Sequence, residues 1–353
     1  MKKKRILKTV TGIILGVVII LSAGVGYLTV REYRPDPVEN VEAGSGERVL
    51  TTDEDITVLS YNTGYAGLSK EEDFFMDGGT KVSPGSQALV ENNLKGISSV
   101  LKEQNADIYF LQEVDVDSKR TYHIDEQKYY EDVLGIPGMF ACNFKCDFIP
   151  YPIPPIGKVT SGLVTMTDLK VGEASRISLP ESFSWPVKTC NLKRCMLETR
   201  IPVAGTEKEL VMINFHLEAY DSGEGKIAQS KMLAEKLESE YKKGNYVVAG
   251  GDFNQTFEGM DKYPIRDKSN WVPGVVTDED IPEGFTYANA DNVPTCRLLN
   301  APYSGNYEDS QVYVIDGFIV SDNISVKLVQ NIDTEFEYTD HQPVRMELSL
   351  KKE

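Results

Sequence analysis

The stretch YVVAGGDFNQTF, residues 246–257, carries the clearest structural signal in the chain. An apolar run leads into two glycines, and Asp252 and Asn254 follow at the point where a buried strand would have to end. Gly, Asp and Asn commonly form the turn after a strand, so this stretch alone predicts a strand and its turn. Whether it also marks a functional site depends on how the other strands end.

Several other apolar runs also end in, or contain, residues that can bind a metal ion or a phosphate. These runs are ITVLSYN, IYFLQEV, VMINFH, VYVIDGFIV and the segment before PVRMELSL. Each polar residue taken alone would more often be solvated or part of a turn. Strands that run to one rim would bring all of them into one pocket, and two of the three histidines in the chain fall at these positions. The residues are Asn62, Glu113, His216, Asp252, Asn254, Asp316, Asp340 and His341.

The sequence of strands and helices favours stacked sheets flanked by helices. Segment 88–107 places apolar residues on one face of a helix, and segment 226–244 predicts a second helix closed by Gly244. Helices are few and separated by many strands, which argues against a helical bundle. Segment 140–157 is rich in proline and cannot be the interior of a regular sheet or helix. It is either a rigid loop or a wall of the substrate groove.

The N-terminus predicts a membrane anchor. Residues 10–30 contain no charge, and 21 residues at about 1.5 Å each cross a hydrocarbon core of roughly 30 Å. Lysines lie only on the N-terminal side, so the positive-inside rule places the remainder of the chain outside the cell. We therefore divide the chain into a cytoplasmic basic tail (1–9), a single-pass signal-anchor (10–30), a linker (31–50) and one catalytic domain (51–353). The alternative is a signal peptide cleaved near residues 22–24, which would make the protein secreted.

The charge of the chain disfavours a general nucleic-acid binder. The formal net charge is −17, and the part after residue 30 carries 32 basic and 54 acidic residues. Such a field repels phosphate backbones unless a local basic groove or bound cations reverse it, so we expect no stable nucleic-acid complex.

The spacing of the cysteines does not indicate a metal site or a catalytic role. An exported chain with five cysteines can form at most two internal disulfides, and no histidine lies near the closely spaced pairs. We expect packing cysteines or one disulfide between the two pairs. The cysteines are Cys142, Cys146, Cys190, Cys195 and Cys296.

The predicted cluster suits phosphoester chemistry. Carboxylate and amide oxygens are the ligands of a hard divalent ion such as Mg²⁺, with Mn²⁺ as the alternative. Such an ion polarises a phosphoryl oxygen and stabilises a leaving group. Asp252 is placed to orient and deprotonate water, and a histidine held by a buried carboxylate can donate to phosphoryl oxygens.

The motifs SYN, LQEV, FHLEA, GGDFN, VIDGFIVS and TDHQPV occur in this order over nearly all of residues 56–350. In this respect the chain resembles the endonuclease/exonuclease/phosphatase superfamily, which includes deoxyribonuclease I, neutral sphingomyelinases and inositol polyphosphate 5-phosphatases. The resemblance implies a four-layer α/β/β/α sandwich. It implies that Asn62, Glu113 and Asp340 form the metal site. It also implies that Asp252 aligns the attacking water beside Asn254, that His216 supports the phosphate or leaving group, and that Asp316 pairs with His341.

Two departures from the family pattern limit the transfer. Many members carry Arg two residues before the Asp of VIDGF, where this chain has Val314, so a phosphate or scaffold contact is either missing or supplied by Arg297. Abasic-site endonucleases lack the histidine that corresponds to His216, which disfavours that branch. Phe183 and Trp185 could contact membrane or substrate, although we expect both to be packed inside.

The sequence thus predicts a Mg²⁺-dependent phosphoric ester hydrolase on the outer face of the cell membrane. Phospholipids or small phosphoesters are favoured as substrates over DNA because the domain is acidic and tethered beside lipid. Two alternatives stay open: a secreted or anchored nuclease, and a surface binding module that keeps the fold without the activity.

Overall fold

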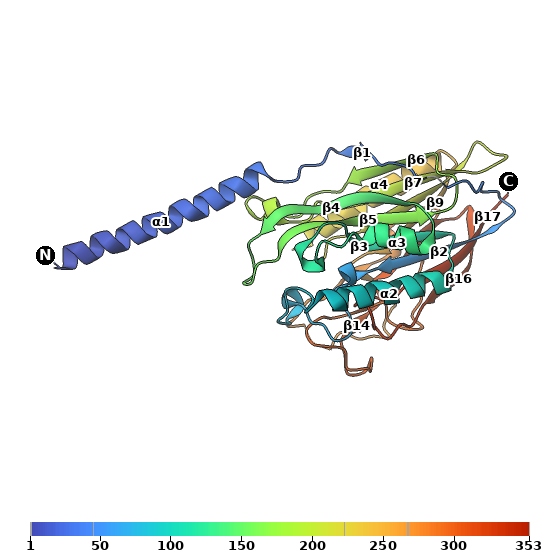
Figure 1. Cartoon of the computed structure of the whole chain (residues 1–353). Helices are drawn as coiled ribbons and strands as arrows, with labels where there is room; N and C mark the ends of the chain where they lie inside the picture. Colours follow the sequence, from blue (N-terminus) through green and yellow to red (C-terminus); the bar gives the residue numbers. More distant parts are fainter. Residues whose placement is uncertain (1, 45, 222, 267, 353) are drawn as a thin grey trace.

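Two β-sheets pack face to face in the computed structural model, which describes residues 2–44, 46–221, 223–266 and 268–352 (Figure 1). One sheet has seven strands in the order β1 (Val38–Asn40), β6 (Glu173–Ser178), β7 (Cys195–Pro202), β8 (Glu209–His216), β9 (Tyr246–Asp252), β15 (Asp316–Ser321), β12 (Phe285–Ala288). The other has six strands in the order β16 (Ile324–Asn331), β17 (Val344–Leu350), β2 (Asp55–Asn62), β3 (Ile108–Asp115), β5 (Gly157–Thr167), β4 (Gly138–Ile149).

The two sheets enclose the main hydrophobic core. Val58 and Phe110 of one sheet and Met212 and Val248 of the other are fully buried in it. Removing apolar side chains from water at about 25 cal/mol per Å² is the main force that holds such layers together.

Helices cover the outer faces of both sheets. Helix α2 (Gln87–Gln104) begins at Ser86, whose side chain accepts from the Leu89 N–H, and it packs with α3 (Glu126–Leu134) on the six-stranded sheet. Helix α4 (Glu224–Lys242) packs on the seven-stranded sheet through Leu233 and Leu237. The predicted four-layer α/β/β/α sandwich is confirmed.

Strand pairing brings the predicted site residues to one rim. β8 and β9 are parallel, and His216 lies opposite Asp252. β15 is antiparallel to β9, so its first residue, Asp316, lies opposite Asp252 as well. In the other sheet β2 and β3 are parallel, and their pairing ends at Asn62 and Gln112.

Two predicted segments differ in the structure. The segment VYVIDGFIVS forms two strands instead of one. Its first strand, β14 (Val312–Tyr313), pairs with β13 (Cys296–Arg297) in a small two-stranded sheet. Its second strand, β15, begins at Asp316, where the chain enters the seven-stranded sheet. A second small ladder joins β10 (Gln255–Phe257) to β11 (Gly274–Val276). Segment 140–157 is not all loop, because β4 continues to Ile149 and the prolines occupy only the turn before β5.

All five cysteines are unpaired, so the disulfide alternative is not realised.

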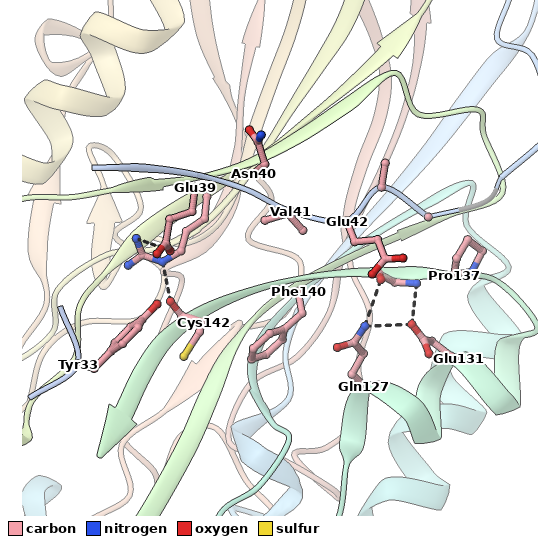
Figure 2. A pocket seen from close by; sticks show the side chains of 14 residues that line it. Tyr33, Glu39, Asn40, Val41, Glu42, Gln127, Glu131, Pro137, Phe140 and Cys142 are labelled. Atoms are coloured by element: carbon pink, nitrogen blue, oxygen red, sulfur yellow. Dashed lines mark hydrogen bonds and ion pairs between the residues drawn. The ribbon is translucent and has the colours of Figure 1, made fainter. Parts of the chain in front are cut away.

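The predicted linker 31–50 is partly built into the domain. β1 pairs with β6, and Leu50 is only 1% exposed, within the core between the sheets. Figure 2 shows residues of this segment, and Glu39 among them lies 3.7 Å from the guanidinium of Arg176. The adjoining cavity of about 750 Å³ contains none of the predicted site residues. The domain therefore begins before residue 51.

Helix α1 (Lys2–Val30) projects from one end of the sandwich (Figure 1). Within it, residues 3–30 are long and apolar enough to cross a membrane, a property that a signal sequence shares. The end of the helix contacts the domain: Leu28 packs beside Cys146 and Ile149, and Arg31 forms an ion pair with Asp147 at 2.6 Å.

Candidate functional site

The two glycines of the opening stretch are required by close strand packing. A Cβ at Gly251 would lie 1.9 Å from the Phe215 carbonyl oxygen, and one at Gly250 would lie 2.3 Å from the ring of Phe318. Gly251 also has φ 145°, which few other residues adopt. The glycines therefore let β9 approach its neighbours closely enough to place Asp252 between them.

Glu113 is presented by an irregularity in β3. The pairing of β3 with β5 shifts between Leu111 and Val114, and Glu113 has φ 56°. A non-glycine residue in the left-handed region costs free energy and is often found at functional sites. The irregularity leaves Glu113 partly exposed to the cavity, although most of its neighbours in β3 are buried.

Asn62 joins the carboxylates from the two sheets. Its Nδ2 donates to Glu113 Oε1 at 3.2 Å and to Asp252 Oδ2 at 3.0 Å, while its Oδ1 accepts from the Gly64 N–H at 3.0 Å. The amide oxygen is thus occupied by the backbone, and the amide nitrogen faces the cluster. This geometry suits positioning of Glu113 better than direct metal ligation by Asn62.

Asp252 lies at the centre of the cluster. Its Oδ2 is 3.3 Å from His216 Nε2 and 3.7 Å from His341 Nε2, and its Oδ1 accepts from the Asn254 N–H at 2.8 Å. Burial, and then the nearby carboxylate of Asp316, raise the pKa of Asp252 to about 7. A carboxylate with such a pKa can accept a proton near neutral pH.

The two histidines differ in charge. Burial, and then Arg194 and His341, lower the pKa of His216 well below its ordinary value, so its ring is neutral at pH 7. Burial opposes the charged form of His341 too, but Cys296, Asp316 and Asp252 together raise its pKa well above the ordinary value. His341 Nδ1 donates to Asp316 Oδ2 at 2.9 Å. The ring that faces Asp252 is therefore cationic at pH 7.

Glu113 and Asp340 fit a hard divalent cation. Asp340 is buried and accepts from the Thr339 hydroxyl at 3.2 Å. Burial, and then the charge of Glu113, raise its pKa to about 6. A divalent ion between these carboxylates would offset both effects, and their oxygen donors suit Mg²⁺ or Mn²⁺.

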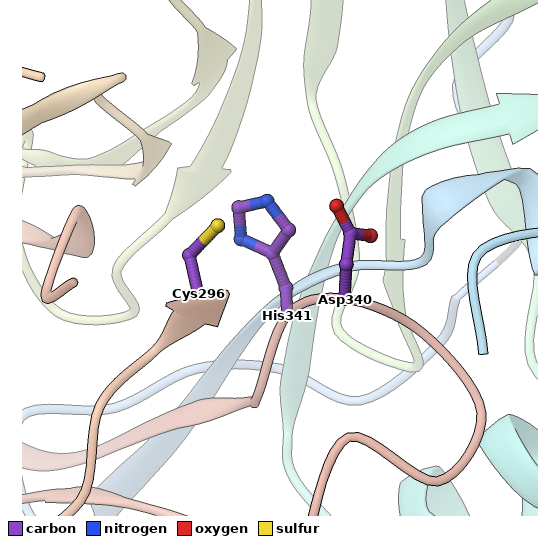
Figure 3. Close-up of side chains that lie close together, drawn as sticks. All are labelled: Cys296, Asp340 and His341. Carbon is purple, nitrogen blue, oxygen red and sulfur yellow. The ribbon is translucent and has the colours of Figure 1, made fainter. Parts of the chain in front are cut away.

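Cys296 lies beside the His341 ring, with Asp340 on the other side of it (Figure 3). Ligand atoms of the three residues lie within 4.8 Å of one another, so they could be taken for a metal site. Burial, however, raises the pKa of the Cys296 thiol to about 12, and metals bind the thiolate. His341 Nδ1 is also occupied by Asp316. The cysteine therefore packs against the histidine.

Arg194 belongs to the site but was missed by the sequence prediction. It is 5% exposed and lines the same cavity as His216 and Asp252. Its Nε lies 3.7 Å from Glu218, while Nε and Nη1 donate no hydrogen bond to any residue that the structure describes. Buried N–H groups that lack a partner are costly, which indicates a place for an anion.

Arg297 lies close to the site, but its side chain is used elsewhere. The guanidinium is buried and donates to the carbonyls of Ser69 at 2.8 Å, Glu72 at 3.0 Å and Ala301 at 3.1 Å. These contacts favour the scaffold role over the phosphate contact, and the substrate role of Arg297 stays a prediction.

One cavity of about 760 Å³ connects these groups. The residues at its polar end include Glu113, Arg194, His216, Asp252, Asn254, Asp340 and His341. Its other walls are largely apolar and include Ile149, Tyr151 and Ile156, so the proline-rich segment does form a wall of the groove.

A model of the Endonuclease/Exonuclease/phosphatase family matches residues 59–341. The chain belongs to this family. The matched range contains all eight residues of the predicted cluster. Enzymes of the Endonuclease/Exonuclease/phosphatase family are typically hydrolases that act on phosphoesters.

Solved structures share the fold of this family. The endonuclease/exonuclease/phosphatase from Beutenbergia cavernae DSM 12333 has a TM-score of 0.59 and 18% identity, over 84% of this chain and 72% of that one. D. rerio TDP2 complexed with a single strand DNA product has a TM-score of 0.53 and 13% identity, over 84% and 100%. The human Nocturnin catalytic domain with bound sulfate has a TM-score of 0.51 and 16% identity, over 86% and 97%. No curated protein gives a significant match to the chain.

Proposed function

We propose that this protein is a membrane-anchored, divalent-metal-dependent phosphoesterase that breaks a P–O bond by in-line attack of water. The observation that carries the proposal is the convergence of Glu113, Asp252 and His216 from three strands, and of His341 from the segment before β17, at one end of one cavity. Family membership supports hydrolysis of a phosphoester, and α1 supports attachment to the membrane.

Glu113 and Asp340 would hold the metal ion, and Asn62 positions Glu113. Mg²⁺ is the proposed ion and Mn²⁺ the alternative, and either would polarise a phosphoryl oxygen and stabilise the leaving oxygen. The Asn254 N–H donates to Asp252 and holds this carboxylate in place. Asp252 takes a proton from a water molecule as the oxygen of that water bonds to phosphorus. The bond from phosphorus to the leaving alkoxide breaks, and the alkoxide takes a proton from solvent.

The remaining polar groups bind the phosphoryl oxygens. His341 is cationic, is oriented by Asp316 and donates from Nε2 to an oxygen that gains charge in the transition state. Arg194 supplies unpaired N–H groups at the same end of the cavity, and neutral His216 supports the phosphate or the leaving group.

We expect Mg²⁺ to stabilise the protein in a pH-dependent way. At a hundredfold excess over Kd, binding stabilises the folded state by about 2.7 kcal/mol. The metal-free pKa of Asp340 is about 6, so protons compete with Mg²⁺ below this pH. The affinity should be full at pH 7.5 and about tenfold lower at pH 5.

The Mg²⁺ affinity is measured by calorimetric titration at pH 7.5 and pH 5, after bound metal has been removed with a chelator. The Asp340→Asn variant should bind Mg²⁺ weakly at both pH values. Binding that is equal at pH 5 and pH 7.5, or that survives in Asp340→Asn, contradicts the metal site.

Arg194→Ala should lower kcat/KM for phosphodiester hydrolysis by about tenfold to a hundredfold, because a hydrogen bond from a charged group contributes about 1.5–3 kcal/mol. Arg194→Lys should recover part of the loss. Steady-state kinetics with a chromogenic diester give the measurement. Arg345→Ala is the control, since Arg345 bonds to the Gln104 carbonyl and does not line the cavity. An Arg194→Ala enzyme with unchanged kcat/KM rules out the anion contact.

Lipid or small phosphoesters are the preferred substrates within this proposal, because the acidic chain and its anchor disfavour nucleic acid. A nuclease is the second candidate, because the D. rerio neighbour holds single strand DNA. A panel of DNA, RNA, phospholipid, inositol phosphates and nucleotides, each with and without chelator, separates the two.

A further inference from the structure

The catalytic cavity extends to the membrane helix. Val25 and Leu28 of α1 line the same cavity as Asp252 and His341. Between these two ends the walls are mainly apolar and include Phe75, Phe144, Ile149, Phe183, Val187 and Leu192. A phosphoester made only of polar groups would have no use for such a lining, whereas hydrocarbon chains would bury apolar surface against it.

The end of α1 is fixed to the domain at this cavity. Trp185 Nε1 donates to Thr29 Oγ1 at 3.1 Å, and Tyr27 donates to Asp147 Oδ2 at 3.2 Å. Glu32 forms a buried ion pair with Lys193 at 2.9 Å. Since the uncharged stretch of α1 ends at Val30, these contacts hold the mouth of the cavity at the outer boundary of the bilayer that α1 would cross.

The mouth is surrounded by exposed apolar side chains. Ile153 is 92% exposed, Tyr151 69% and Trp185 59%, which makes the expectation of a packed Trp185 wrong. Phe148, Val187 and Met76 are also exposed. Segments 148–157 and 183–187 contain no charged residue. Apolar patches with Tyr and Trp are typical of surfaces that lie at the level of lipid head groups.

We propose that this rim, formed by residues 148–156 and 183–187, lies in the outer head-group layer and that the cavity takes the acyl chains of a membrane phospholipid. The phosphodiester of that lipid then reaches Glu113, Asp252 and Asp340. Water adds across one P–O bond, and the products are diacylglycerol with a head-group phosphate, or phosphatidate with a head-group alcohol. The inference rests on the proposed phosphoesterase activity and names its substrate class.

The test compares three substrates with the full-length protein in vesicles of phosphatidylcholine and phosphatidylglycerol. The substrates are the vesicle lipids, monomeric dihexanoylphosphatidylcholine and a chromogenic diester. Ile153→Glu should lower vesicle-lipid hydrolysis at least about tenfold, because a carboxylate opposes insertion at the head-group level. Ile153 does not line the cavity, so the other two rates should stay within about twofold of wild type.

Val187→Glu tests the cavity itself, because Val187 lies at its mouth. It should lower hydrolysis of both phospholipids relative to the chromogenic diester. Ile227→Glu is the matched control, since Ile227 is an exposed isoleucine on α4 that lies outside the cavity, and it should change none of the three rates. Equal rates on vesicle lipid for wild type, Ile153→Glu and Val187→Glu overturn the inference.

A second measurement does not depend on activity. In a Trp271→Phe background, fluorescence of Trp185 should be quenched by phospholipid brominated near the glycerol end of its chains. Absence of quenching overturns the docking face. Hydrolysis of the chromogenic diester without hydrolysis of any phospholipid overturns only this inference, whereas hydrolysis of no substrate in the panel overturns the proposed function.

Discussion

Asp252→Asn should lower kcat for phosphodiester hydrolysis by about 10²- to 10⁴-fold, the range that a general base contributes. Asparagine has nearly the same shape and can still accept from the Asn254 N–H, but it cannot take a proton from water. Steady-state kinetics at saturating Mg²⁺ give the measurement. Asp132→Asn, an exposed carboxylate on α3, serves as the control and should keep full activity. A variant that retains more than about a tenth of wild-type kcat excludes the role.

The same substitution should not destabilise the metal-free protein at high pH. The pKa of Asp252 is raised to about 7 in the folded state, so its contribution to stability is present at low pH and is lost as the pH rises through 7. Asparagine does not titrate and avoids this loss. The melting temperature of Asp252→Asn relative to wild type should therefore be higher at pH 8 than at pH 5.

Glu113→Gln separates the metal ligand from the base. Glu113 is expected to act through the ion, so excess Mg²⁺ should restore part of the activity of Glu113→Gln and none of that of Asp252→Asn. If Mg²⁺ rescues both variants or neither, the assignment of separate roles is wrong.

The strand ends could be predicted from the sequence because the physics that creates them is local. An apolar run followed by a polar residue marks the end of a buried strand, as at Asn62 and His216. Parallel neighbours end on the same side, so His216 and Asp252 had to lie close together once β8 and β9 paired. The proximity of His216 and Asp252 follows from these two steps.

Arg194 reaches the rim from the beginning of a strand, as the predicted Asp316 does, but it was missed. Arg194 precedes β7, which is antiparallel to β8, and Met196 lies opposite Phe215. Because β7 and β8 are antiparallel, a residue just before β7 lies at the same rim as the residue that ends β8. A search for basic residues at the start of strands would have found Arg194, but the antiparallel pairing had to be known first.

Side-chain direction and long-range contacts also lay beyond the sequence. The amide nitrogen of Asn62 faces the carboxylates because the Gly64 N–H takes its oxygen. Arg297 is held by the carbonyls of Ser69 and Glu72, more than two hundred residues away. Trp185 is exposed, and its indole N–H bonds to Thr29 at the end of α1. Composition and periodicity contain no information on such contacts.

His341→Gln should lower kcat by about 10²- to 10³-fold, the loss seen when one donor to a developing oxyanion is removed. The effect should appear in kcat more than in KM, because the charge on the phosphoryl oxygens grows in the transition state. His123→Gln is the matched control: His123 is the histidine outside the cavity, exposed and paired with Asp117 at 2.7 Å. It should leave kcat unchanged.

Asp316→Asn tests whether this carboxylate positions and charges His341. The carboxylate raises the pKa of His341, so the ring is charged below its raised pKa and loses the charge as the pH rises through it. Without the carboxylate this pKa falls, and the alkaline limb of the kcat profile should move to lower pH. A merely structural role for Asp316 would lower kcat at every pH and leave the limb in place. An unmoved limb in Asp316→Asn, with the loss in His341→Gln intact, would leave His341 as a donor whose charge does not depend on Asp316.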